Sequence, residues 1–366
     1  MKLLVAVSSP GPAESLSLLV KELRRRGIET DLINVSNDNG GTLRSDIVYQ
    51  GARSILKSSG VDFKEADSFG PLPDYYNVSV EFAAGLLDRL QPDKVLVGTY
   101  RDLTMERVTL EDALIVAARM ARIPVFQFVD MWDNWFQKKK LSIEPDAFLV
   151  QDGITERLIR KRGGGSGTYN IVGNPSLEWF IRTRTTRQKR LSKELFGLEG
   201  RRVIAYFGQC APVNNEISLG WAMEALGASD VLIFCKHPRD ERELAMRYRN
   251  DSRMIELPVS SDDILDVTDI CLTHTSTMSI KASFLKIKTI NIIPAGECDE
   301  LLSECGGYPL SLMGGSILVR SSGELHEALA SETFHSINFA SFVEETNTGH
   351  AIEKMTGLLR TLSHNA

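Results

Sequence analysis

The stretch LLVAVSSPGP, residues 3 to 12, is a short apolar run that ends in two serines and a Pro-Gly-Pro turn. An amphipathic stretch from Ala13 to Arg26 follows, then Gly27 and a second run from Thr30 to Val35. This order predicts a strand, a loop, a helix, a glycine stop and a second strand, which together make one βαβ unit. Continuous apolar runs are typical of strands that are buried on both faces of a parallel sheet.

The same alternation of apolar runs and helical patterns extends over the whole chain. In the first half, further runs occur at residues 94–98, 123–129, 147–150 and 169–172. After Gly173-Asn174-Pro175 a second series has its runs at 202–208, 231–235, 254–257, 270–273, 289–293 and 317–319. We therefore predict an α/β protein with two facing, doubly wound Rossmann-like domains, residues 1–180 and 181–366, each built on a parallel sheet. A last helical stretch, 349–362, is a candidate to pack back on the first half.

The composition is that of an ordinary globular protein. The chain has 366 residues, of which 43% are hydrophobic and 25% are charged, and a length of this order favours two domains. Its formal net charge of -6 gives no reason to expect a nucleic-acid partner, since nucleic-acid readers usually carry a basic face. The basic run at 182–190 is interpreted as a solvated helix or linker at the domain junction.

Cysteine usage and hydropathy predict a cytoplasmic protein. Five cysteines without a CxxC pair support neither a disulfide framework nor a zinc site, and we predict no metal. The apolar start ends at Ser8 without a cleavage-type site, and no run reaches the length of a membrane-spanning helix. The first loop lacks GxGxxG and no Walker motif occurs, so we predict no cofactor.

Ligands of open parallel sheets bind beyond the carboxyl ends of the strands, which directs attention to the residues after each run. Lys236-His237-Pro238-Arg239 follows one run, and its cations and imidazole suit a phosphate or a nucleotide. The alternative is an exposed turn whose histidine caps a helix. Thr273-His274-Thr275-Ser276-Thr277 follows another run and precedes a helix. One hydroxyl suffices for capping, so four hydroxyls favour an anion site at the helix N-terminus.

Acidic residues follow two runs of the first half. Asp130 and Asp133 lie beside two tryptophans, where an acid is either a general base with a raised pKa or a structural acid that caps a turn. Asp102 follows the run at 94–98, with Arg101 able to pair with it. Glu111 and Asp112 follow Thr109 in a capping-box arrangement, which accounts for both of them structurally.

The first loop of the second half supplies the last candidates. Gly208 and Gln209 follow the run at 202–208 and are candidates to face a ligand. Cys210 comes next, but the sequence offers no partner that would activate it as a nucleophile.

With these motifs in order, the chain resembles the GT-B superfamily, glycosyltransferases and sugar-nucleotide epimerases built from two facing Rossmann domains. The nearest pattern is that of bacterial UDP-N-acetylglucosamine 2-epimerases, carried by segments 92–97, 123–130, 145–148, 155–157, 172–175 and 267–282. That family has a Thr-Asp-Ser-Gly-Gly turn followed by paired glutamates, one of which holds the UDP ribose. Here the glutamate positions fall on Ile280 and Lys281, whereas the family's acid after Ile-Pro-Val is matched by Asp130.

His237-Pro238 followed by a Ser/Thr-rich turn also resembles a second branch of the superfamily, bacterial sialyltransferases, polysialyltransferases and CDP-glycerol-type polymerases. In that branch such residues hold the phosphate of a cytidine nucleotide. The resemblance implies that His237, Ser276 and Thr277 contact the donor phosphate. It also implies that Asp130 or Asp102 deprotonates the acceptor hydroxyl.

The leading hypothesis is a metal-independent glycosyltransferase that uses a nucleotide-activated sugar, CMP- or CDP-linked, in bacterial surface or secreted glycan synthesis. The donor would bind the second domain through residues 208–209, 236–238 and 274–277. A glycan or glycolipid acceptor would bind the first, which leaves peripheral membrane association open. The alternatives are an enzyme like UDP-N-acetylglucosamine 2-epimerase and a non-catalytic scaffold that binds a nucleotide.

Overall fold

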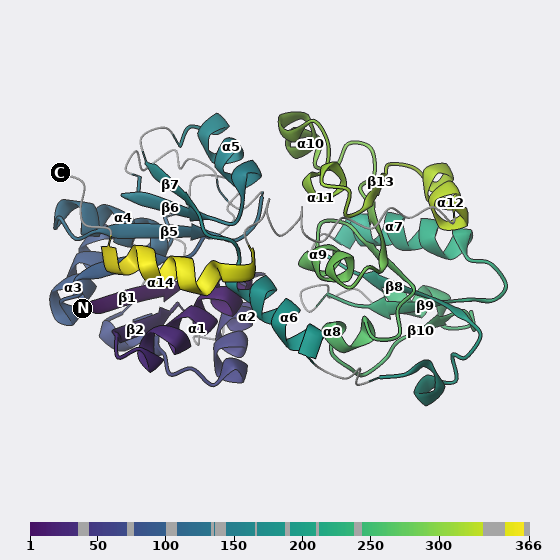
Figure 1. Cartoon of the computed structure of the whole chain (residues 1–366), viewed down its shortest axis with the longest axis horizontal. Helices are drawn as coiled ribbons and strands as arrows, with labels where there is room; N and C mark the ends of the chain where they lie inside the picture. The colour runs from purple at the N-terminus through teal and green to yellow at the C-terminus, as the bar shows by residue number, and fades with distance from the viewer. Residues whose placement is uncertain are drawn as a thin grey trace. The chain divides into compact units, whose positions relative to one another are not determined.

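The structure, a computed structural model, describes residues 1–35, 44–71, 77–99, 108–132, 135, 144–164, 167–186, 191–209, 212–237, 244–331 and 348–361, without the side chains of 44–51, 185–186, 212–214 and 348. The chain divides into two compact units, which are drawn in Figure 1. The first unit comprises Met1–Trp179 and Val343–Ala366, and the second comprises Phe180–Phe342.

The first unit is built on a parallel sheet. Among the described residues the sheet has seven strands in the order β3-β2-β1-β4-β5-β6-β7. The strands are β1 (Lys2–Val7), β2 (Glu29–Asn34), β3 (Lys64–Glu65), β4 (Lys94–Val97), β5 (Val125–Val129), β6 (Ala147–Val150) and β7 (Thr168–Ile171). The helices are α1 (Pro10–Arg25), α2 (Arg44–Ser59), η1 (Ala66–Phe69), α3 (Val80–Leu90), α4 (Leu110–Met120), α5 (Gly153–Lys161), η4 (Thr348–His350) and α14 (Ala351–Thr361).

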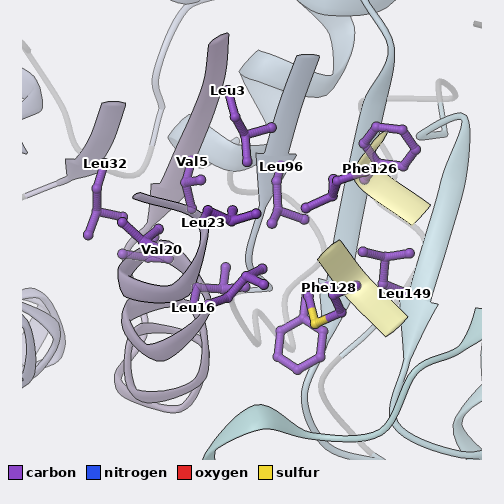
Figure 2. Packing of buried hydrophobic residues seen from close by; sticks show 14 of the residues in the cluster. Leu3, Val5, Leu16, Val20, Leu23, Leu32, Leu96, Phe126, Phe128 and Leu149 are labelled. Carbon is purple, nitrogen blue, oxygen red and sulfur yellow. The ribbon is translucent and has the colours of Figure 1, made fainter. Parts of the chain in front are cut away.

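Both faces of this sheet are covered by helices, as the continuous apolar runs predict. Helices α3 and α4 pack on one face, against side chains such as Leu4 and Val95. Helices α1, α2 and α14 pack on the other face. Figure 2 shows side chains of α1, among them Leu16, beside the apolar side chains of the neighbouring strands. The central strands β1 and β4 are therefore buried from both sides.

The second unit repeats this arrangement. Over its described residues a six-stranded parallel sheet has the order β10-β9-β8-β11-β12-β13. The strands are β8 (Arg202–Phe207), β9 (Asp230–Cys235), β10 (Met254–Ile255), β11 (Ile270–Thr273), β12 (Lys288–Ile292) and β13 (Ile317–Val319). The helices are η2 (Lys193–Phe196), α7 (Pro212–Ala225), η3 (Leu244–Tyr248), α8 (Ser261–Ile264), α9 (Thr277–Phe284), α10 (Asp299–Cys305), α11 (Pro309–Leu312) and α12 (Ser322–Ala330). Helices α7 and α12 cover one face, and α8 and α9 the other.

The ends of the predicted domains need one correction. The chain passes from the first unit to the second within helix α6 (Pro175–Thr186), between Trp179 and Phe180. The last helix, however, belongs to the first unit and not to a domain of residues 181–366, because Met355 and Leu359 are fully buried in the core of the first sheet. Lys94 Nζ of β4 also donates to the main-chain oxygen of Leu359 at 2.7 Å.

No helix among the described residues is long and apolar enough to cross a membrane.

Candidate functional site

Both sheets have the strand order of doubly wound folds, which places a topological switch point where the winding reverses. In the first sheet the switch point lies between β1 and β4. Ala6 pairs with Val97, and Val97 pairs with Gln127, so the carboxyl ends of β1, β4 and β5 lie at one edge. Ser8, Thr99 and Asp130 follow these strand ends and therefore come together there.

Asp130 is held against the first turn of α1. Its side chain is almost fully buried, and Thr99 Oγ1 donates to Asp130 Oδ1 at 3.2 Å. A Cβ added to Gly11 would lie 2.1 Å from Asp130 Oδ2, so only glycine leaves room for this carboxylate. Asn174 Nδ2 donates to the main-chain oxygen of Asp130 at 3.1 Å and thereby fixes the backbone. The helix N-terminus favours the negative charge of the carboxylate.

Glu111 lies at the same edge, which the capping interpretation did not anticipate. Asp112 does close the capping box, because its carboxylate accepts from Thr109 N at 3.0 Å and Thr109 Oγ1 accepts from Asp112 N. Glu111 instead turns inward and is only 1% exposed, with its Oε1 at 2.5 Å from Ser8 Oγ. Burial raises the pKa of the Glu111 carboxyl, which favours its neutral form.

The remaining acidic predictions of the first unit have other outcomes. Asp102 and Asp133 lie outside the described residues.

The two tryptophans near Asp130 make hydrogen bonds to other residues. Trp132 Nε1 donates to Asp152 Oδ2 at 2.6 Å, and Trp135 Nε1 donates to Gln127 Oε1 at 3.1 Å. Asp152 also accepts from Thr155 N at 2.7 Å and so caps α5, which makes it a structural acid.

In the second sheet the register brings the predicted nucleotide residues to one edge. Phe207 pairs with both Cys235 and Thr273, and Thr273 pairs with Asn291. The segments that follow these strand ends are 208–209, 236–237 and 274–277, and they therefore lie at neighbouring positions. Lys236 is exposed and His237 is half-buried, whereas Pro238 lies outside the described residues.

The loop after β8 is fixed by a residue that sequence reasoning missed. Asn215 of α7 accepts from Gln209 N at 2.8 Å and donates to Gln209 O at 2.6 Å. Gly208 N donates to Cys235 O at 2.9 Å, and a Cβ on Gly208 would lie 3.3 Å from His237 N. The loops that follow β8 and β9 are therefore closely packed. The signal for this in the sequence was Gly208 together with Asn215, seven residues later.

The four hydroxyls before and at the start of α9 divide into two kinds. Thr273 is buried and donates to Phe207 O at 2.9 Å, while Ser276 Oγ caps the helix by accepting from Met278 N at 3.2 Å. Thr275 and Thr277 are half-buried and remain at the surface of the turn. His274 is buried, and its main-chain oxygen accepts from Asn291 Nδ2 at 2.8 Å. Capping thus explains the hydroxyl of Ser276, and a bond to the main chain of β8 explains that of Thr273. Thr275 Oγ1 lies 3.4 Å from His274 Nδ1.

Two positions later in α9 bear on ribose recognition. Ile280 and Lys281 are both buried, and Lys281 Nζ pairs with Asp262 Oδ1 of α8 at 3.0 Å. Lys281 therefore links two helices of the unit. No acid at these positions offers a carboxylate to a ribose.

The whole chain is similar to solved sugar-nucleotide enzymes. One of them is UDP-N-acetylglucosamine 2-epimerase from Neisseria meningitidis, solved with UDP-N-acetylglucosamine. The match covers 99% of this chain and 100% of that enzyme, with 13% sequence identity and a TM-score of 0.66. For the UDP-N-acetylglucosamine 2-epimerase from Methanocaldococcus jannaschii, the match covers 98% of this chain and 99% of that enzyme, with 16% sequence identity and a TM-score of 0.63. The chain has the GT-B fold.

MurG from Acinetobacter baumannii shares this fold as well. The match covers 99% of this chain and 99% of MurG, with 11% sequence identity and a TM-score of 0.60. No family model matches the chain, and no curated protein matches it. At these identities the likeness establishes the fold, and the chemistry has to be argued from the residues.

Proposed function

We propose that this chain acts on a nucleotide-activated sugar, binding the nucleotide phosphates at the carboxyl edge of the second sheet and inverting a carbon of the sugar. The observation that carries the proposal is the meeting of segments 208–209, 236–237 and 274–277 at that edge. The similarity of the whole chain to UDP-N-acetylglucosamine 2-epimerases supports epimerisation ahead of the glycosyl transfer expected from the sequence.

Phosphate binding would draw on three sources in the second unit. The N-terminus of α9 provides backbone N–H groups and the positive end of the helix dipole. Thr275 and Thr277 add hydroxyl donors at the surface of the turn, and Lys236 adds a cation. His237 lies two residues beyond β9 and would contribute a further donor.

Inversion of a sugar carbon requires one group that removes a proton and another that returns a proton. The first unit has two carboxyls in contrasting surroundings at one edge. Asp130 lies beside the first turn of α1 and is the candidate for the group that accepts a proton. Glu111 is buried and favours the neutral form that donates one. Thr99 Oγ1 donates to Asp130 Oδ1 and Ser8 Oγ donates to Glu111 Oε1, so each hydroxyl would hold its carboxyl in place.

A glycosyltransferase is the second candidate, and specific observations favour it. The chain matches MurG over nearly its full length, and the positions of the ribose-binding glutamates carry Ile280 and Lys281. In a transferase, Asp130 would take the proton of an acceptor hydroxyl instead. The two candidates differ in one requirement, because only the transferase needs an acceptor.

The first experiment is thermal stabilisation by UMP, UDP, CMP, CDP, GDP and ADP at fixed concentration. A bound nucleotide at 100 times its Kd stabilises the fold by about 2.7 kcal/mol. We expect a shift with at least one nucleotide and its loss in His237→Ala. The nucleotide that shifts Tm identifies the donor class, UDP for the epimerase and CMP or CDP for a cytidine transferase. If none of the nucleotides shifts Tm, the proposal of a nucleotide site is wrong.

A further inference from the structure

The Gly173-Asn174-Pro175 motif joins β7 to α6 and places a buried amide side chain at the start of the helix. Gly173 turns the chain with a φ of 85°, a conformation that residues with a side chain rarely adopt. Pro175 is the first residue of α6, where the N–H that it lacks would have no partner within the helix. Asn174 lies between them and is only 2% exposed.

The side chain of Asn174 connects three elements of the first unit. Its Oδ1 accepts from Ser15 Oγ of α1 at 2.9 Å, and from Ser176 N and Ser176 Oγ of α6 at 3.0 Å and 2.9 Å. Its Nδ2 donates to the main-chain oxygen of Asp130, directly after β5, at 3.1 Å. Because Ser176 N can only donate, it fixes the oxygen of the amide on its own side and turns Nδ2 toward Asp130.

The carboxylate of Asp130 lies in a position that leaves little tolerance. Its Oδ2 is 2.1 Å from the place that a Cβ on Gly11 would take, and its Oδ1 accepts from Thr99 Oγ1 at 3.2 Å. A shift of the main chain at Asp130 would change both contacts. Asn174 holds this main chain at the point where β5 ends.

We propose that Asn174 is a positioning residue for Asp130, because it ties the main chain of Asp130 to α1 and α6 and so fixes where the carboxylate meets Gly11. The effect on catalysis rests on the proposed function, in which Asp130 accepts a proton, since a proton acceptor loses rate when it is misplaced. The effect on the position of the carboxylate does not depend on that function.

A single backbone amide reports on this position. Pro-Gly occurs once in the sequence, at Pro10-Gly11, so carbonyl-13C proline combined with 15N-glycine labels one peptide bond. The Gly11 signal is compared in the wild type, Asn174→Asp and Asn174→Ser. Both variants keep an oxygen that can cap α6 and lose the amide donor to Asp130, and the serine variant adds no charge. Ser176→Ala is the matched control, because it removes one hydrogen bond to Asn174 and leaves the bond to Asp130 in place.

We expect the Gly11 signal to move in both Asn174 variants and to stay in place in Ser176→Ala. Deuterium incorporation into UDP-N-acetylglucosamine in D2O is measured on the same proteins. In the Asn174 variants we expect kcat to fall about 100-fold while KM changes by less than about twofold, because a misplaced group slows the reaction without weakening substrate binding. In Ser176→Ala we expect both constants to stay at the wild-type values.

A Gly11 signal that stays in place in the Asn174 variants, or that moves equally in Ser176→Ala, would overturn the proposal. Asn174→Asp decides the question if Asn174→Ser does not fold. A moved signal with an unchanged kcat would contradict the catalytic effect. If the wild type incorporates no deuterium, the proposed function fails, whereas the Gly11 signal still decides whether Asn174 positions the carboxylate.

Discussion

The helices α1 and α9 both begin at the carboxyl edge of a parallel sheet, yet their first turns offer a ligand opposite surroundings. The turn of α1 contains two prolines and carries the carboxylate of Asp130. The turn of α9 is capped by its own Ser276 and has Thr275 and Thr277 at its surface. The helix dipole has the same sign in both places, so the side chains around each turn decide whether an anion can bind there.

The difference teaches that one fold can assign separate tasks to equivalent edges. In the first unit the chain places its own carboxylate, that of Asp130, beside the turn. In the second unit the hydroxyls and Lys236 provide for an anion from outside. Four predictions test this contrast.

The largest expected effect concerns the carboxylate on α1. Asp130→Ala removes the charge at the helix N-terminus and leaves the Thr99 hydroxyl without its acceptor. We expect the free energy of unfolding to fall by about 3 kcal/mol, because the buried Thr99 hydroxyl loses its acceptor and a favourable charge near the helix N-terminus is lost. Urea denaturation with an unchanged slope measures it. A loss below 0.5 kcal/mol (roughly that of a surface change) would mean that the carboxylate does not serve the helix.

A second effect concerns the loop that packs beside His237. Asn215→Ala leaves both the N–H and the oxygen of Gln209 without their side-chain partner. We expect a loss of about 2 kcal/mol of stability together with weaker nucleotide binding. Denaturation and nucleotide titration are measured on the same preparation. If the stability falls while nucleotide affinity is unchanged, the loop does not take part in the site.

The third prediction concerns the protonation of Glu111, which lies at the same sheet edge as Asp130. Burial raises the pKa of Glu111 above its ordinary value of 4.5, so the folded state binds this proton more tightly than the unfolded state does. The stability that it contributes is complete below pH 4.5 and is lost as the pH rises through the folded-state pKa, with a slope of up to about 1.4 kcal/mol per pH unit. Glu111→Gln should lack this component. If the stability of the two proteins changes with pH in the same way, the pKa of Glu111 is the same in the folded and unfolded states, which would contradict the prediction.

The smallest effects separate capping from ligand binding at α9. Ser276→Ala should lower the stability by about 1 kcal/mol, because it removes the cap of Met278 N. Thr277→Ala should leave the stability unchanged within about 0.5 kcal/mol and weaken nucleotide binding about tenfold. Each variant thus serves as the control of the other. If Ser276→Ala and Thr277→Ala weaken nucleotide binding equally and neither changes the stability, Ser276 contacts the ligand as well.

The fold could be predicted because its signals are local. Buried parallel strands give continuous apolar runs, and the runs at 3–7 and 202–208 are confirmed as the central strands β1 and β8. The edge strand β3, Lys64–Glu65, has no apolar run and was missed. The docking of α14 was left as an open candidate, because it depends on contacts between residues far apart in the chain, such as Lys94 and Leu359, which are 265 positions apart.

The sheet edge could be predicted from the sequence, but the contacts of its side chains could not. The segments after β8, β9 and β11 follow strand ends and lie at this edge, and their role in binding stays a prediction. The partners of each side chain depend on tertiary packing, and no spacing in the sequence indicates that Glu111 turns inward to Ser8 or that Trp132 bonds to Asp152. The contact of Asp130 with Gly11 spans more than a hundred residues and was likewise out of reach.

The most direct test of the proposed function is incubation with UDP-N-acetylglucosamine in D2O without any acceptor, followed by proton NMR of the sugar. If the chain inverts a sugar carbon by removing and returning a proton, deuterium enters that carbon, and the incorporation is lost in Asp130→Asn and in His237→Ala. A sugar that stays free of deuterium under conditions where the nucleotide shifts Tm would contradict epimerisation of this substrate and favour the transferase.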